Sequence, residues 1–161
     1  MNTNILNKIE NNAKLTTEEL AIFLETSASE ISEEIKRMED DGIICGYHTL
    51  INWEKTDRDY VTALIELKVT PVRGLGFDKI AERIYRFDEV KSVYLMSGGY
   101  DFMVIIEGKT MKDIAMFVTG KLAPLDSVLS TATHFVLKKY KDHGEVFATT
   151  KHDDERMVVS P

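Results

Sequence analysis

The sequence has little of several features that would by themselves define a class of protein. Its 161 residues include one cysteine, Cys45, which excludes a disulfide framework or a thiolate zinc site and is typical of a reducing cytoplasm. No apolar run approaches the roughly 20 residues that a membrane-spanning helix needs. The N-terminal MNTNILNKIENN has no basic segment followed by an apolar block, so no secretory signal is predicted. We therefore expect a cytoplasmic protein without a membrane partner.

An excess of positive charge is also lacking. Lysine and arginine number 20 against 27 aspartates and glutamates, and the net charge of −7 argues against a globally basic nucleic-acid binder. The imbalance is confined to the first third, because residues 1–57 hold five basic and twelve acidic side chains and the rest holds fifteen of each. Hydrophobic residues make up 43%, enough for one or two small cores. The sequence thus predicts two regions with different electrostatics.

Residues 1–51 predict three short helices and a small hairpin. The first helix covers about residues 3–11, and the next two each begin with a hydroxyl residue followed three positions later by glutamate, which is a capping box. These pairs are Thr16 with Glu19 and Ser27 with Glu30.

Asp41-Gly42 is expected to end the third helix, since glycine readily takes the left-handed conformation. Residues 43–45 and 47–51, separated by Gly46, then predict a hairpin. Three helices and a hairpin make a winged helix-turn-helix, in which the third helix enters the DNA major groove. A generic helical domain that ends in a hairpin fits the same pattern, and the pattern alone does not separate the two.

The polar stretch 52–59 is the expected linker, and residues 60–141 alternate between strand and helix patterns. Strands are expected near 61–69, 90–97, 102–107 and 128–140, and helices near 77–84 and 111–122. The order βαββαβ is the ferredoxin-like arrangement, so the fold class is α+β. Its uncovered sheet face should pair with a second copy through apolar side chains. The candidates are Tyr60, Leu64, Val90, Tyr94, Met96 and Phe135. Residues 142–161 are expected to form a polar tail.

From Ile5 to about Lys141, this plan resembles the Lrp/AsnC family of prokaryotic transcriptional regulators. In the first domain the resemblance rests on Leu20-Ala21, Ser27–Ile31, Ile35–Glu39, Gly42–Ile44 and Gly46-Tyr47. In the second it rests on Gly98–Phe102, Phe117-Val118, Lys121-Leu122, Val128–Thr133 and Leu137-Lys138.

The resemblance implies a homodimer, or a tetramer of dimers, that binds promoter DNA and responds to a small amino-acid-like effector. Effector contacts are then expected at Ser97, Gly98, Tyr100, Asp101, Thr131 and Thr133. Glycines expose backbone donors, a carboxylate can meet an ammonium group, and hydroxyls can bind a carboxylate. Alternatively, the two glycines form a plain tight turn that Asp101 caps. No cofactor is implied.

DNA contacts are expected from the second and third helices and the turn before them. The candidates are Lys14, Thr16, Ser27, Ala28, Ser29, Ser32, Glu33, Lys36 and Arg37. Glu33 and Glu34, however, stand where relatives usually carry basic residues on the exposed face of the third helix. Carboxylates near DNA oppose phosphate neutralisation. Three explanations of this acidic charge in a family of DNA-binding proteins remain open. The basic contacts are few and concentrated, an oligomer gains avidity from several weak contacts, or the protein is a stand-alone sensor that has lost DNA binding.

An enzyme is not expected. Related decarboxylases of the same two-domain plan rely on histidines in the second domain, and residues 93–98 contain none. No serine–histidine–acid set or paired carboxylate stands out either. Cys45 and His48 on a small hairpin are too few to complete a tetrahedral metal site. We therefore predict neither catalytic nor metal-binding residues.

Overall fold

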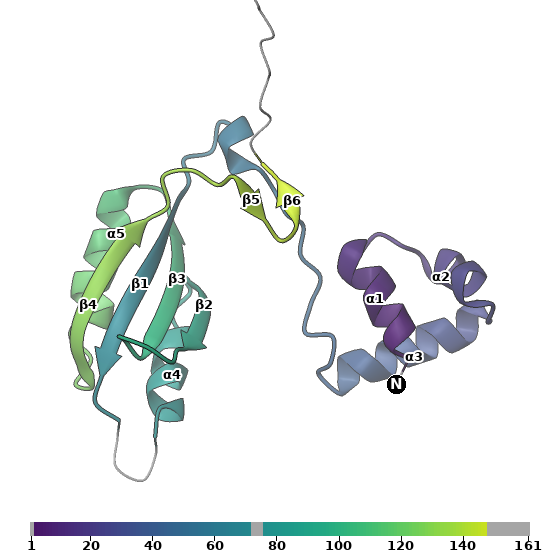
Figure 1. The fold of residues 1–161 in the computed structure, drawn as a ribbon, viewed down its shortest axis with the longest axis horizontal. Helices are drawn as coiled ribbons and strands as arrows, with labels where there is room; N and C mark the ends of the chain where they lie inside the picture. The colour runs from purple at the N-terminus through teal and green to yellow at the C-terminus, as the bar shows by residue number, and fades with distance from the viewer. Residues whose placement is uncertain (1, 72–75, 148–161) are drawn as a thin grey trace, which may run out of the picture. The chain divides into compact units, whose positions relative to one another are not determined.

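The chain divides into two compact units, residues 1–51 and 52–161 (Figure 1). The computed structural model describes residues 2–71 and 76–147. No helix in these ranges is long and apolar enough to cross a membrane.

Three helices make up the first unit: α1 (Thr3–Asn11), α2 (Thr17–Leu24) and α3 (Ala28–Asp40). Both predicted capping boxes are confirmed, because the N-cap hydroxyl of each accepts from the third backbone N–H and the glutamate accepts from the N-cap N–H. The helices enclose a small apolar core of Ile5, Leu20, Ala21, Ile31 and Met38. Short helices are marginal alone, so these caps and this core stabilise the unit together.

The predicted end of α3 is confirmed, but the hairpin after it is wrong. Gly42 takes φ +69°, and the N–H groups of Ile43 and Ile44 both donate to the carbonyl of Met38. Between α3 and Trp53, the structure has no strand among these described residues. The amides after α3 serve its C-cap, and Gly46 alone is shorter than the two-residue loop of a tight hairpin.

A four-stranded antiparallel sheet with two helices forms most of the second unit. Its elements are β1 (Val61–Val69), α4 (Asp78–Tyr85), β2 (Val90–Leu95), β3 (Phe102–Gly108), α5 (Met111–Phe117) and β4 (Val128–Phe135). The strand order β2-β3-β1-β4 confirms the predicted βαββαβ arrangement. The turn Val118–Leu122, a π-helix, continues α5. Figure 1 shows α4 and α5 on the same side of the sheet.

The last strand is shorter than the predicted 128–140. Val136 donates its N–H to Thr62, next to the first residue of β1, so β4 has no partner strand beyond this point. A short hairpin of β5 (Lys141–Asp142) and β6 (Glu145–Val146) follows, at the start of the expected polar tail. Within the expected linker, η1 (Trp53–Lys55) is a 3₁₀ turn whose indole packs 5.8 Å from the ring of Tyr60.

The two faces of the sheet differ in their cover. Alternate residues of β1 and β3, including Ile65, Leu67, Phe102 and Val104, are buried against α4 and α5. The opposite, open face carries Leu64, Tyr94, Met103, Ile105 and His134, as the strand register places them.

Val90 and Phe135 do not lie on the open face as predicted, because both pack against the buried core. A register irregularity between Val90 and Ser92 interrupts the alternation of β2. A bulge of this kind moves a residue to the other face of the sheet.

Candidate functional site

The exposed side of α3 carries a stripe of polar side chains. Ser29, Ser32, Glu33 and Lys36 are exposed and follow the spacing that places residues on one face of a helix. We call these four residues the α3 stripe. Lys36 is its only cation, and it has no ion-pair partner among the residues that the structure describes. The α3 stripe thus offers one free positive charge and two hydroxyls next to the carboxylate of Glu33.

Other predicted DNA contacts on α3 point elsewhere. Ala28 is half-buried and packs against the core, so it faces inward rather than toward the exposed side. Glu34 does not share the face of Glu33, because its carboxylate accepts from the N–H of Asn2 and pairs with the guanidinium of Arg37 at 2.6 Å. These hydrogen bonds lower the pKa of Glu34. The acidity that faces outward from the middle of α3 therefore comes from Glu33 alone.

The N-termini of α2 and α3 already hold carboxylates. Glu19 accepts from the N–H of Thr16, and Glu30 accepts from the hydroxyl of Thr26 and from the N–H of Ser27. The bonds from Thr26 and Ser27 lower the pKa of Glu30, so it stays ionised at this helix end. A phosphate approaching either N-terminus meets a negative charge there, which weakens the helix-dipole attraction.

Lys14 lies in the turn between α1 and α2, where its N–H donates to the side chain of Asn12. Its side chain is exposed. The structure therefore leaves Lys14 and Lys36 as the accessible cations among the predicted DNA contacts, with Arg37 paired to a glutamate of the same helix.

Four of the predicted effector contacts lie in the loop between β2 and β3. Ser97, Gly98 and Tyr100 lead into Asp101, whose carboxylate accepts from the N–H of Val69 at 2.8 Å. The Asp101 N–H also donates to Leu67, and its carbonyl accepts from Met96. Asp101 thus joins this loop to the end of β1, and at least one of its oxygens has a structural role.

The other two predicted contacts lie across β1 from that loop. Thr131 pairs with Leu67 and Thr133 with Ile65, so both are on β4 and on the helix-covered side of the sheet. Asp101, at the start of β3, is about two strand spacings away, on the order of 10 Å. Within one subunit the structure brings the loop residues together, but it does not bring them to the threonines.

A cavity of about 440 Å³, which no sequence pattern indicated, lies between the start of α4 and the start of β4. Its lining includes Thr70, Ile80, Arg83, Asp126 and Ser127, and we call it the α4 cavity. Lys79 and Arg83 stand four residues apart on α4, but such a pair on a helix is usually a solvated face and does not indicate a cavity.

No cluster of three or more potential metal ligands occurs in the two described ranges. The free thiol of Cys45 is exposed and contacts the carbonyl of Gly42 at 3.2 Å.

Similarity to known proteins identifies the class of this protein. Residues 62–146 match the sequence profile described as the Lrp/AsnC ligand binding domain. An uncharacterised HTH-type transcriptional regulator of Bacillus subtilis, YugG, is 51% identical over 99% of this chain and 96% of its own length. The protein is therefore a ligand-responsive transcriptional regulator rather than an enzyme. It belongs to the Lrp/AsnC family.

More distant relatives agree with this assignment. The leucine-responsive regulatory protein of Haemophilus influenzae is 28% identical over 85% of this chain and 82% of its own. A transcriptional regulator of Neisseria meningitidis, solved as an L-Met complex, has a TM-score of 0.68 at 25% identity and covers 86% of this chain and 88% of that one.

Proposed function

We propose that α1–α3 form a helix-turn-helix whose α3 stripe enters the major groove of promoter DNA. The observation that carries this proposal is the outward placement of Ser29, Ser32, Glu33 and Lys36 on a helix capped at both ends. Recognition helices contact base edges with their N-terminal residues, and the first three of these positions lie in that part of α3. Serine reads bases with little discrimination, while glutamate accepts from the amino group of cytosine.

Affinity then depends on few phosphate contacts. Among the predicted DNA contacts, Lys36 and Lys14 are the accessible cations, whereas Arg37 must first leave Glu34. Each neutralised phosphate contributes to affinity and to its salt dependence, so a single unit should bind weakly. Linked copies raise the effective concentration of the second contact, and we therefore propose that an oligomer binds DNA cooperatively.

We propose that a second copy covers the open face of the sheet. This face presents Leu64, Tyr94, Met103 and Ile105, and the Tyr94 side chain is half exposed in one subunit. Uncovered apolar surface of this kind favours self-association, and a twofold axis lets one face serve both partners. The polar segment 52–59 serves as the linker to the first unit, and dimers assemble further into a tetramer of dimers.

The proposed effector is a small amino-acid-like molecule. Ser97, Gly98, Tyr100 and Asp101 of one subunit would contact it, and Thr131 and Thr133 would complete the site from another copy, since β1 separates the two sets within one chain. The L-Met complex of the Neisseria meningitidis relative supports this ligand class. A regulator of promoters acts where the DNA is, so we propose a cytoplasmic location.

A stand-alone sensor that has lost strong DNA binding is the second candidate. The carboxylates at the N-termini of α2 and α3, together with Glu33, favour it. Each of them adds repulsion on the side that would approach the phosphates.

One binding experiment separates the two candidates. The full chain is titrated onto labelled DNA from upstream of its own gene at several salt concentrations, with and without each common L-amino acid. Salt-sensitive binding that one amino acid changes supports the DNA-binding regulator. Absence of binding at the lowest salt, while an amino acid still raises the melting temperature, supports the stand-alone sensor.

A further inference from the structure

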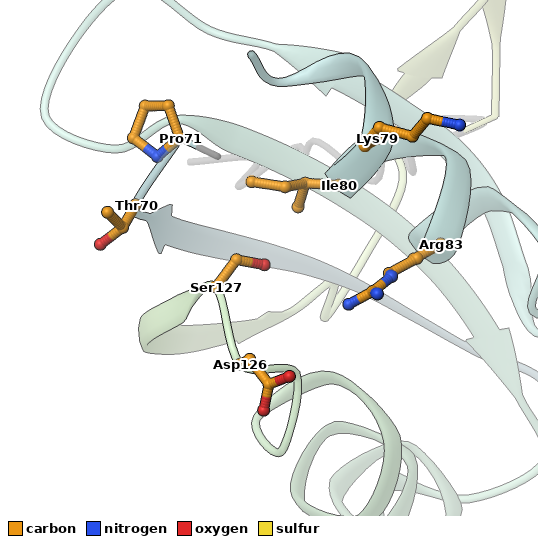
Figure 2. A pocket seen from close by; sticks show the side chains of 7 residues that line it. All are labelled: Thr70, Pro71, Lys79, Ile80, Arg83, Asp126 and Ser127. Carbon is orange, nitrogen blue, oxygen red and sulfur yellow. The ribbon is translucent and has the colours of Figure 1, made fainter. Parts of the chain in front are cut away.

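The α4 cavity has two opposite charges, Arg83 and Asp126, that have no partner among the residues that the structure describes. Figure 2 shows Arg83 of α4 reaching toward Asp126 and Ser127, which precede β4. Neither the Arg83 guanidinium nor the Asp126 carboxylate forms an ion pair or hydrogen bond within the residues that the structure describes, and they do not meet each other within 4.0 Å. The cavity therefore has one cationic and one anionic side with space between them.

The other basic residue of the lining is already engaged. Lys79 points away from the centre of the cavity in Figure 2, and its ammonium pairs with Glu82 at 3.2 Å. Arg83 is thus the cation available to a ligand. Its planar guanidinium suits a carboxylate, because the two can form parallel hydrogen bonds.

The floor of the cavity adds apolar surface and an unsatisfied hydroxyl. Ile80 is buried at its centre, and Pro71 closes one side. The Ser127 side chain is nine-tenths buried, and its Oγ has no hydrogen-bond partner among the described residues. An unpaired buried hydroxyl costs free energy, so a polar ligand group beside it would be stabilised.

Hydrogen bonds at the end of β1 join one wall of the cavity to the loop between β2 and β3. The N–H of Thr70 donates to the carbonyl of Ser127 at 2.8 Å, which fixes the end of β1 against the segment before β4. One residue earlier, the N–H of Val69 donates to the carboxylate of Asp101. A change at the cavity wall can therefore reach the β2–β3 loop through two consecutive residues of one strand.

We propose that the α4 cavity binds a small zwitterion of the α-amino-acid type, with its carboxylate on Arg83 and its ammonium on Asp126. The side chain of the ligand lies against Ile80 and Pro71. The volume is in the range of small-molecule sites, and a lining of apolar residues with a few convergent polar groups is typical of them. This site shares no residue with the β2–β3 loop or with the two threonines. The regulatory role of the bound ligand rests on the proposed function, but the binding itself does not.

The test measures binding without DNA. Each common L-amino acid is first screened for its effect on the melting temperature of the full chain. Those that raise the melting temperature are then titrated by calorimetry into the unchanged protein, into the variants Arg83→Gln and Asp126→Asn, and into the control variant Arg86→Gln. Arg86 is on the same helix but outside the cavity lining, where it pairs with Glu82. Removal of one charged partner should weaken binding about tenfold or more in each cavity variant. The control should bind as the unchanged protein does.

Ligand analogues test the two charges separately. The decarboxylated amine should bind the unchanged protein weakly, and the corresponding hydroxy acid should bind weakly because it lacks the ammonium group. In Asp126→Asn, the preference for the amino acid over the hydroxy acid should shrink, which a merely structural effect of the substitution would not produce.

Two results would overturn the proposal. In the first, both cavity variants still bind the amino acid and Asp101→Ala does not. This result would place the effector site at the β2–β3 loop and would leave the proposed function intact. The other is the absence of amino-acid binding in a chain that still binds DNA. Conversely, if the chain binds the amino acid through Arg83 but does not bind DNA, the ligand site in the α4 cavity is supported and the proposed DNA binding is contradicted.

Discussion

The two units of this protein differ in how they are stabilised and in where they carry charge. Among the residues that the structure describes, the core of the first unit buries five apolar side chains and relies on helix caps, while the core of the second buries thirteen between a sheet and two helices. The first third of the chain also holds the whole net charge, and the remainder is balanced. The unit proposed to meet DNA is therefore both the less buried and the more acidic one. Its function must depend on a few well-placed side chains rather than on the field of the whole unit.

The largest expected effect is in the core of the second unit. Phe102 is 1% exposed and packs edge-on against Phe77 with ring centroids 5.8 Å apart. Phe102→Ala should lower the free energy of unfolding of this unit by about 3–5 kcal/mol, because it leaves a cavity between sheet and helices. Calorimetry should show the corresponding transition at a lower temperature, with the transition of the first unit unchanged.

The matching substitution in the first unit is Leu20→Ala. Leu20 is fully buried in the five-residue core, and its truncation should cost about 2–4 kcal/mol. This is enough to unfold a three-helix unit of marginal stability. Circular dichroism should show a loss of helix while the second unit keeps its own melting transition. If each variant instead lowered both transitions equally, the division into two independent units would be wrong.

An intermediate effect is expected for Asp101→Ala. The substitution removes the acceptor for the Val69 N–H and frees the β2–β3 loop from β1. A hydrogen bond to a charged group is worth about 1.5–3 kcal/mol, so the midpoint of chemical denaturation should fall by a corresponding amount. Asp101→Asn retains an acceptor oxygen and serves as the matched control, with a smaller loss. Equal losses in the two variants would contradict this structural role.

A gain of stability is expected for Glu25→Gly. Glu25 ends α2 in the left-handed conformation at φ 52°, which costs a non-glycine residue about 1 kcal/mol. Glycine takes this conformation without the penalty, so the first unit should melt at a higher temperature. Glu25→Gln removes the charge but keeps a side chain in the left-handed conformation, so it should leave the melting temperature nearly unchanged. An equal rise in both variants would assign the effect to charge.

The smallest effect is a pH dependence in the second unit. Burial, followed by a hydrogen bond with Glu107, raises the pKa of Tyr60 to about 12. Because this exceeds the value of about 10 in an unfolded chain, the stabilisation is complete below roughly pH 10 and is lost as the pH rises toward 12. The free energy of unfolding should fall across this window in the unchanged protein and fall less in Tyr60→Phe. Tyr85→Phe, at an exposed tyrosine, should retain the full dependence.

Local signals in the sequence were sufficient to predict much of the fold. Hydroxyl–glutamate pairs at Thr16 and Ser27 predicted where α2 and α3 begin, because a capping box involves only residues three apart. Strict alternation in residues 61–69 predicted β1 because one side of that strand is buried from Ala63 to Val69.

Features that depend on distant partners were not predictable in this way. The end of β4 is set by the start of β1, about seventy residues earlier, and the placement of Phe135 follows from that pairing. Glu34 was assigned to the exposed face with Glu33, but it accepts from the N–H of Asn2, the N-cap residue of α1. The α4 cavity likewise joins Arg83 to Asp126 through the folding of the sheet, so no local pattern contained it.

The salt dependence of DNA binding in Lys36→Ala and Arg37→Ala, each compared with the unchanged protein, tests the central claim most directly. Removing a side chain that neutralises one phosphate should make the slope of log affinity against log salt concentration shallower by about one. We predict that Lys36→Ala has this effect and weakens binding to all sequences, whereas Arg37→Ala changes the slope less because Glu34 already neutralises it. Lys112→Ala, which removes an exposed charge from the second unit, should change neither quantity. A slope that Lys36→Ala leaves unchanged would contradict the proposal that the α3 stripe enters the groove.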